Sequence, residues 1–247
     1  MENTAASTSR LSLPPVGLWT GALDMVPANR ARQLAAELEG LGYGAIWVPE
    51  VAGRDPFVRL ALLLSATDRI ICATGIASIW ARDAVTTSCA ATTLTEAFPE
   101  RVVVGLGASH ANLVTGLRGH DYDKPLTAMR AYLDGIERAP YTAHRPETPV
   151  RYVLAALRRR MLGLAGERTA GAHPLTVTTT APFTVTTRIG RFGRRSSAWW
   201  RGSRHGAGWW SARCRVVVVM VAPACGRART RPDPIFSRRA GAAAASG

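Results

Sequence analysis

The sequence predicts an α/β protein in the form of an incomplete TIM-like barrel, with about six βα units followed by an irregular or disordered Arg-rich tail. Three observations predict this. Short segments that are apolar throughout recur along residues 12–174, as in parallel sheets covered on both faces. Segments with helical periodicity lie between them, and each strand–helix unit spans roughly thirty residues. After Leu175 this alternation stops.

The first unit has clear boundaries. Val16–Thr20 is the first predicted strand. Pro27 then starts a helix, because its fixed φ suits a first helical turn, and Gly42 ends that helix in a left-handed conformation. The second strand is Ala45–Pro49, with Glu50 at its carboxyl end.

Aspartate residues define the starts of the next two helices, because an aspartate side chain accepts hydrogen bonds from the free amides of a first turn. Asp55 caps a helix over residues 57–66, and Asp83 caps one over residues 84–98. Between them, residues 70–79 form the third predicted strand.

The later units repeat the pattern in a less regular form. The predicted elements are a strand at 102–106, a helix starting at Pro125, a strand at 150–155, a helix at 158–166 and a strand at 169–174. An open doubly wound sheet and a closed eightfold barrel both fit this order. The first βα turn, residues 20–26, has no Gly-x-Gly-x-x-Gly, so a dinucleotide fold loses support and the barrel is favoured.

The net charge of +14 is concentrated at one end of the chain. Residues 1–174 contain 18 Lys and Arg against 16 Asp and Glu, whereas residues 175–247 contain 13 Arg and a single acid. Leu175 is the last leucine, and no Glu, Lys or Asn follows it. We therefore divide the chain into a disordered N-terminus at 1–11, a barrel portion at 12–174 and a low-order basic tail at 175–247.

Two interpretations of the tail stay open. One lysine against thirty arginines indicates a GC-rich gene, and reading such a gene out of frame produces Arg, Gly, Ala, Pro and Trp. We therefore hypothesise a frameshift near codon 175. The alternative is an Arg-rich nucleic-acid-binding arm, since Arg and aromatic residues contact phosphates and stack on bases. In either case Val216–Val221 is an isolated apolar run that could form a strand.

Composition also narrows the class of protein. No apolar run approaches the length of a membrane-spanning helix, and the N-terminus lacks the cationic and apolar regions of a secretory signal. The four cysteines have no metal-ligand spacing, so no metal site is predicted. We expect a cytoplasmic protein without a membrane partner.

Several segments resemble the luciferase-like monooxygenases, and in particular the branch that uses the deazaflavin coenzyme F420. The matching segments are Gly-Leu-Trp-Thr-Gly (17–21), Leu-Gly-Tyr-Gly-Ala-Ile-Trp-Val-Pro-Glu (41–50), Ala-Thr-Gly-Ile-Ala-Ser-Ile-Trp-Ala-Arg (73–82), Phe-Pro-Glu-Arg-Val-Val-Val-Gly-Leu-Gly-Ala-Ser-His (98–110) and Ala-Gly-Ala-His-Pro (170–174). The likeness covers roughly residues 12–174.

The resemblance implies a site at the carboxyl ends of the strands. There a deazaflavin, or alternatively FMN, would exchange hydride with a small organic substrate. The family often has a strained non-proline peptide bond at the end of the third strand, which would pass under the ring. Carried over by position, the implied cofactor-binding residues are Gly75, Ile76, Ala77, Ser78, Gly105, Gly107, Ser109 and His173, and the implied catalytic residues are His110 and Glu50.

Each of these residues also has a purely structural interpretation. Gly105 and Gly107 would permit a tight turn in any strand-to-loop connection. The hydroxyl and imidazole that follow them could be ordinary polar groups of a loop. Glu50 could be a helix cap or an ion-pair partner, and His173 could only satisfy backbone groups.

The irregular tail stands where the last two strands of a barrel would be, and this affects the expected activity. Six strands without the last two leave open sheet edges, and TIM barrels frequently bind phosphate with the loops after strands seven and eight. We therefore expect an oxidoreductase, either active or inactivated by the lack of the last strands, and the alternative is a non-catalytic barrel remnant. A small-molecule substrate and a second copy of the chain, in a homodimer, are the partners considered, and nucleic acid is not favoured.

Overall fold

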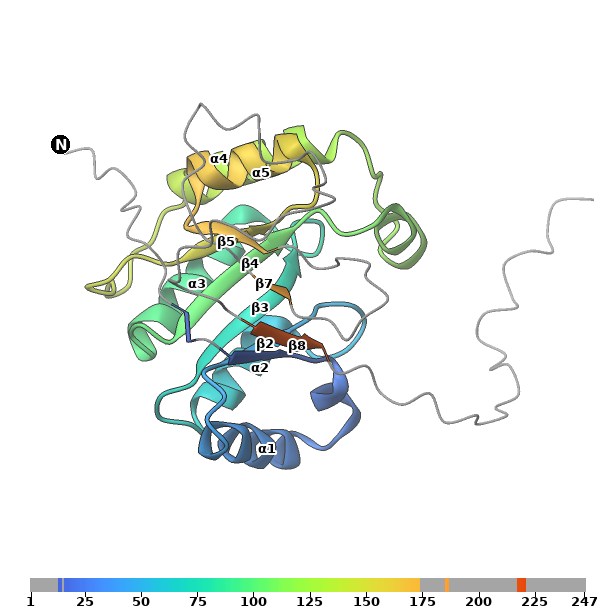
Figure 1. The fold of residues 1–247 in the computed structure, drawn as a ribbon. Helices are drawn as coiled ribbons and strands as arrows, with labels where there is room; N and C mark the ends of the chain where they lie inside the picture. Colours follow the sequence, from blue (N-terminus) through green and yellow to red (C-terminus); the bar gives the residue numbers. More distant parts are fainter. Residues whose placement is uncertain (1–12, 15, 174–184, 187–216, 221–247) are drawn as a thin grey trace, which may run out of the picture.

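A computed structural model describes residues 13–14, 16–173, 185–186 and 217–220 of the chain. Within them, all six predicted strands are present and each pairs in parallel with the next (Figure 1). The strands are β1 (Val16–Trp19), β2 (Ala45–Val48), β3 (Ile71–Ser78), β4 (Val102–Gly107), β5 (Tyr152–Ala155) and β6 (Gly171–His173). The incomplete barrel predicted from the sequence is thereby confirmed.

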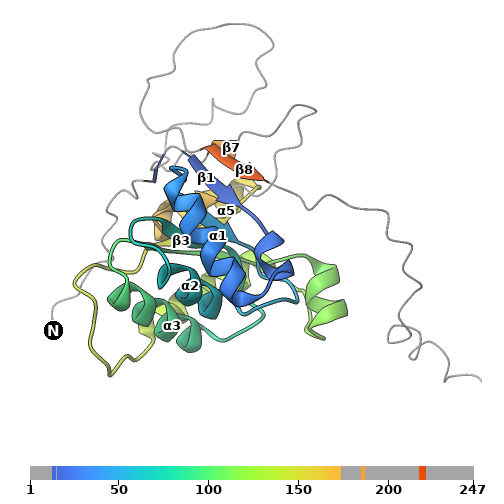
Figure 2. The same ribbon diagram turned by 90° about the horizontal axis from the view of Figure 1, so that it is seen from below.

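In the described part of the chain, five α-helices cover the outer face of this curved sheet, and Figure 2 shows the first three of them side by side. They are α1 (Ala28–Gly40), α2 (Pro56–Leu64), α3 (Ala84–Ala97), α4 (Pro125–Arg138) and α5 (Arg159–Arg168). Each helix contacts the next one along the chain, so the five form a continuous layer. None of the helices in the described part of the chain has the length and apolarity needed to cross a bilayer.

The predicted helix starts at Asp55 and Asp83 are confirmed. The Asp55 carboxylate accepts hydrogen bonds from the amides of Phe57 and Val58 at 2.9 and 3.1 Å, and that of Asp83 accepts from the Thr86 amide at 2.8 Å. Two short elements were not predicted from the sequence. They are a 3-10 helix, η1 (Ala22–Met25), after β1 and a π-helix, η2 (Asn112–Leu117), after β4.

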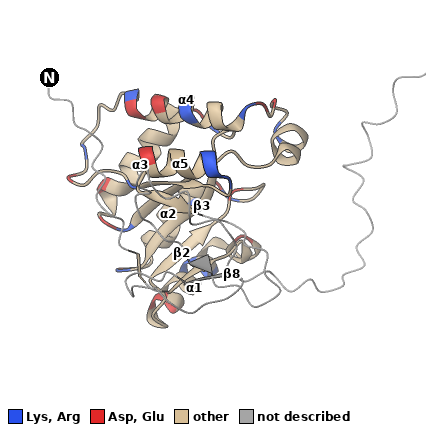
Figure 3. Ribbon diagram, turned by 45° about the horizontal axis from the view of Figure 1, so that its top comes forward, with Lys and Arg blue, Asp and Glu red and all other residues tan. Residues whose placement is uncertain are grey.

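Alternate residues of each strand face two different cores. In β4, Val102, Val104 and Leu106 pack under the helices, whereas Val103 belongs to the core on the inner face. No residue of β1 to β6 is a Lys, Arg, Asp or Glu, and in Figure 3 the charged residues lie on helices and loops. The sheet is thus apolar on both faces, as expected for parallel strands inside an α/β fold.

The inner face of β4 has glycine where the neighbouring strand comes close. A Cβ at Gly105 would collide with the backbone oxygen of Thr74, and a Cβ at Gly107 would lie 2.5 Å from Cδ1 of Ile76. Both glycines lie within the strand, and neither has a positive φ. Close approach to β3, and not a tight turn, therefore explains these two glycines.

The facing segment of β3 is irregular. The Gly75–Ile76 peptide bond is cis, at the place where the family resemblance implied an unusual peptide bond. The register with β4 shifts between Thr74 and Ala77, and Ile76 is the one residue of β3 that is not fully buried. A Cβ at Gly75 would lie 2.9 Å from the ring of Trp19, so glycine is required here as well.

One aromatic contact crosses the interior of the curved sheet. The rings of Trp47 on β2 and His173 on β6 are stacked, with centroids 4.5 Å apart and planes 9° apart. Because three strands separate β2 from β6, the sheet must curl as a barrel does to bring them together. Burial lowers the pKa of His173 from 6.5 to about 4, so the imidazole is neutral at pH 7.

Two further strands come from the predicted tail. The strand β8 (Val217–Met220) pairs in parallel with β1, and β7 (Val185–Thr186) pairs with β8 in the antiparallel sense. The first edge of the six-stranded sheet is therefore covered, which corrects the expectation of an open edge there. In a closed eightfold barrel, the side beside strand one belongs to strand eight. The predicted N-terminal segment 1–11 and most of the tail lie outside the described residues.

Replacing Gly105 by alanine is expected to lower the free energy of unfolding by about 1–3 kcal/mol, because the new Cβ meets backbone that has no room to move. Gly116→Ala is the matched control, since a Cβ at that position of η2 meets nothing within 4 Å. Urea unfolding of both variants measures the difference. Equal stabilities would show that β3 and β4 do not approach as closely as described.

His173 should make stability depend on pH. Its pKa is about 4 when folded and 6.5 when free, so below pH 6.5 the unfolded chain binds a proton that the folded chain does not. The stability contributed by the neutral ring is complete above pH 6.5. It is lost as the pH falls towards 4, with a slope of at most about 1.4 kcal/mol per pH unit.

His173→Phe, which keeps a ring against Trp47, should flatten this dependence in urea titrations. The exposed residue His120 provides the control. A His120→Gln variant should keep the slope of the unaltered protein, and an unchanged slope in His173→Phe would refute the assignment.

Candidate functional site

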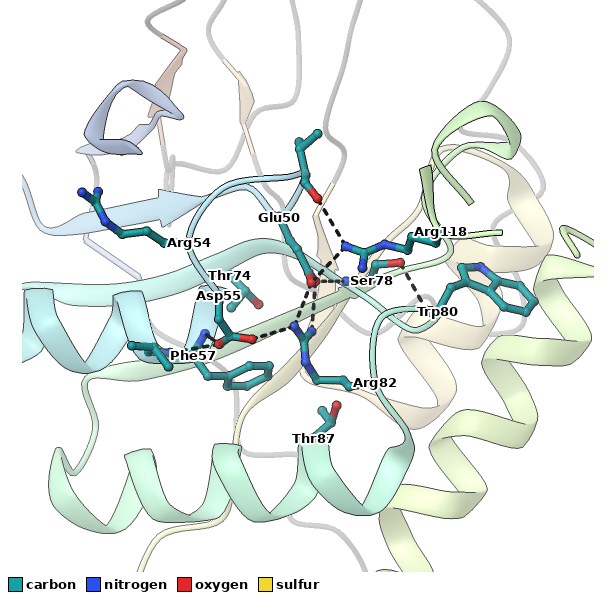
Figure 4. A network of polar contacts seen from close by, with 12 residues as sticks. Glu50, Arg54, Asp55, Phe57, Thr74, Ser78, Trp80, Arg82, Thr87 and Arg118 are labelled. Carbon is teal, nitrogen blue, oxygen red and sulfur yellow. Dashed lines mark hydrogen bonds and ion pairs between the residues drawn. The ribbon is translucent and has the colours of Figure 1, made fainter. Parts of the chain in front are cut away.

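The predicted site residues lie along one edge of the sheet, because parallel strands all end on the same side. Glu50 follows β2, Ser78 ends β3, Gly107 ends β4 and His173 ends β6. Polar groups at this edge are where α/β barrels place their ligands. Figure 4 shows the polar network that begins at Glu50.

The side chain of Glu50 is only 8% exposed, and both of its carboxylate oxygens accept hydrogen bonds. Arg82 donates to Oε2 at 2.9 Å and to Oε1 at 2.7 Å, and Arg118 donates to Oε1 at 3.2 Å. The amide of Ser78 donates to Oε2 at 2.7 Å. In return the Glu50 amide donates to the carbonyl of Ile76 at 3.2 Å. Glu50 thus joins the end of β2 to β3 and, through Arg118, to the segment after β4.

Arg82 is the second centre of this network (Figure 4). Besides Glu50, its guanidinium contacts Asp55 at 3.0 Å and lies 5.1 Å from the centroid of the Phe57 ring. Burial alone would lower the pKa of Arg82, but the hydrogen bond and charge of Glu50, with those of Asp55, raise it overall. Arg82 is therefore a permanent cation, matched by two acids.

Two other arginines connect the loops after β1 and β2. Arg54 donates to the carbonyls of Leu23 and Val26 at 2.7 and 2.6 Å. Arg59, buried on α2, donates to the Pro49 carbonyl at 2.9 Å and pairs with Asp24 at 3.0 Å. The carboxyl edge is consequently held by guanidinium groups that reach from one loop to the next.

None of these four arginines was predicted from the sequence as part of the site. One signal was available for Arg59, which stands within the apolar run Pro-Phe-Val-Arg-Leu-Ala-Leu-Leu-Leu of α2. A charged residue in such a run is buried only when it is paired. Arg54, Arg82 and Arg118 carry no comparable local signal, because their partners lie on other loops.

The loop after β4 carries Ser109 and His110. The Trp80 indole donates to the Ala108 carbonyl at 2.8 Å, and the Tyr122 hydroxyl donates to the Ser109 carbonyl at 3.3 Å. Ser109 has a φ of 59°, and the exposed His110 begins the turn that leads into η2. Two aromatic side chains thus hold the backbone of this loop, and the imidazole of His110 stays accessible.

The structure brings some of the predicted residues together and separates others. Glu50 contacts Ser78 directly and, through Arg118, the end of the π-helix that follows the loop of His110. His173 instead stacks on Trp47 inside the barrel, and its two ring nitrogens have no hydrogen-bond partner in the described part of the chain. Among the described residues no cluster of His, Cys, Asp and Glu is suited to hold a metal ion.

Comparisons with known proteins agree with this architecture. The sequence model of the luciferase-like monooxygenase family matches residues 9–186. The protein Rv3520c of Mycobacterium tuberculosis, which is named as a coenzyme F420-dependent oxidoreductase, is 31% identical over 168 residues. That match covers 65% of this chain and 46% of the relative, so the chain spans about half the length of its relative.

Three solved structures share the fold. An F420-dependent secondary alcohol dehydrogenase in complex with an F420-acetone adduct has 17% identity and a TM-score of 0.52, with 65% of this chain and 58% of the other covered. The coenzyme F420-dependent tetrahydromethanopterin reductase of Methanopyrus kandleri has the same identity and TM-score, with 66% and 55% covered. The oxygenating constituent of 3,6-diketocamphane monooxygenase of Pseudomonas putida, in complex with FMN, has 14% identity and a TM-score of 0.53, with 64% and 56% covered. At these identities the likeness establishes the fold alone.

The family match, by contrast, extends over well more than half of the sequence, and the chain therefore belongs to the luciferase-like monooxygenase family.

Proposed function

We propose that this chain is an oxidoreductase that transfers hydride between a deazaflavin and a small organic substrate at the carboxyl edge of the sheet. The observation that carries the proposal is the irregular end of β3 against the glycines of β4. Ile76 is the one partly exposed residue of β3, and Gly105 and Gly107 add no side chains beside it. Such a surface suits one face of a planar ring.

The residues fit a deazaflavin at this place. Gly75 to Ser78 and the glycines of β4 would hold the ring, and Ser109 would contact it from the loop. When bound, the deazaflavin supplies a carbon that accepts or donates hydride. The exposed imidazole of His110 is the group we propose for moving a proton on the substrate, because imidazole both donates and accepts protons near neutral pH.

The identity of the cofactor rests on the relatives. The curated relative and two of the three solved structures are named for F420, and the third contains FMN. We therefore propose F420 as the cofactor and FMN as the alternative. The substrate is proposed only as a small organic molecule.

Titration of the purified chain with F420 tests the proposal, and quenching of the deazaflavin fluorescence reports binding. We expect saturable binding of F420 that is tighter than the binding of FMN. Ile76→Glu should weaken it at least about tenfold, since a charge would face the ring. Val58→Glu is the matched control, because Val58 is 60% exposed on α2. If neither cofactor binds the unaltered chain, the proposed function is wrong.

We also propose that the residues after Leu175 come from a shifted reading frame. The family match ends at residue 186, shortly after the change in composition. Translating the other two frames of the gene downstream of codon 175 should reveal a Leu- and Glu-containing helical pattern. If neither frame restores that pattern, the frameshift hypothesis is wrong.

A further inference from the structure

The contacts of Glu50 are unlike those of a residue that exchanges protons with a substrate. A carboxylate has about four lone-pair positions. In Glu50 two contacts from Arg82, one from Arg118 and one from the Ser78 amide account for four donors. These contacts leave no acceptor position for a substrate, which favours a supporting role for Glu50 over the catalytic role that the family resemblance implies.

We propose that Glu50 is a positioning residue, which holds the Ile76–Ser78 segment of β3 and the segment after β4 in one arrangement. The effect of Glu50 on cofactor binding rests on the proposed function, because those two segments are the ones assigned to the deazaflavin. The inference that Glu50 holds the two segments depends only on its own contacts.

The link to β3 is double. The Glu50 amide donates to the Ile76 carbonyl at 3.2 Å, and the Ser78 amide donates to the Glu50 carboxylate at 2.7 Å. These two bonds lie on either side of Ala77, where regular pairing with β4 resumes after the register shift. Glu50 thus supports the part of β3 that the irregular pairing with β4 leaves less constrained.

The link to the segment after β4 runs through Arg118. Its guanidinium contacts both Glu50 and the carbonyl of Val51, at 3.2 and 3.3 Å. Arg118 directly follows η2, whereas Trp80 and Tyr122 hold the beginning of the same segment. Since the Arg118 side chain is only 24% exposed, losing Glu50 would leave a cation partly buried without its acid.

Hydrogen exchange of the full-length protein without cofactor tests the placement. Glu50→Gln should speed exchange at least about tenfold in peptides covering 76–78 and 112–118. Arg118→Gln should speed it in 112–118 alone, because Arg82 and Ser78 keep their bonds to Glu50. Asp55→Asn is the matched control. It removes the same charge beside Arg82, its oxygen still caps α2, and it contacts neither Ser78 nor Arg118.

The pattern between variants decides the inference. If Glu50→Gln exchanges like Asp55→Asn, or if Arg118→Gln leaves 112–118 protected, Glu50 does not position these segments. Should Glu50→Gln fail to fold, Arg118→Gln still provides the test.

Cofactor titration separates this inference from the proposed function. In a chain that binds F420, Glu50→Gln should lose at least about tenfold in affinity, whereas Asp55→Asn should lose less than about twofold at a similar melting temperature. Unchanged affinity with faster exchange would show that the two segments do not serve the cofactor. If the unaltered chain binds neither F420 nor FMN, the proposed function fails and the exchange pattern still decides the role of Glu50.

Discussion

The close approach of β3 and β4 is the constraint on which the rest of the structure depends. Gly105 presents no side chain to the Thr74 backbone, and Gly107 leaves room for the Ile76 side chain. The bulged end of β3 then exchanges hydrogen bonds with Glu50, and that residue connects the loops of three strands. The polar arrangement at the edge of the sheet therefore depends on close packing of the strands at its centre.

The polar arrangement is built from ion pairs, in which each arginine is neutralised by a nearby acid. A buried ion pair gains little net stability, because removing both charges from water costs about as much as their attraction returns. Its value here lies in geometry, since Arg82 and Arg118 each satisfy Glu50 from a different loop. Arg59 and Asp24 repeat the arrangement between the loops after β1 and β2. Such pairs favour one arrangement of loops over many.

Much of the fold followed from local signals in the sequence. Asp55 and Asp83 cap the helices that they were predicted to cap, and the apolar strands occur where expected. The parallel pairing of Val217–Met220 with β1 was not foreseen, because an apolar tetrad indicates a strand but not its partner. The π-helix at Asn112–Leu117 was also missed, since no capping residue or helical stripe announces it.

The contacts within the candidate site could not be predicted from local sequence signals. By itself the sequence determined the order of the βα units, the side of the sheet on which polar residues gather and the family to which the segments are similar, because these follow from short motifs and periodicity. Only the tertiary structure decided which of those polar residues contact one another. Glu50, Arg82 and Arg118 are far apart in the chain, and they meet because the curled sheet places β2, β3 and β4 side by side with their carboxyl ends at one edge. The same curl places His173 against Trp47 inside the barrel, where burial and not sequence context keeps its ring neutral.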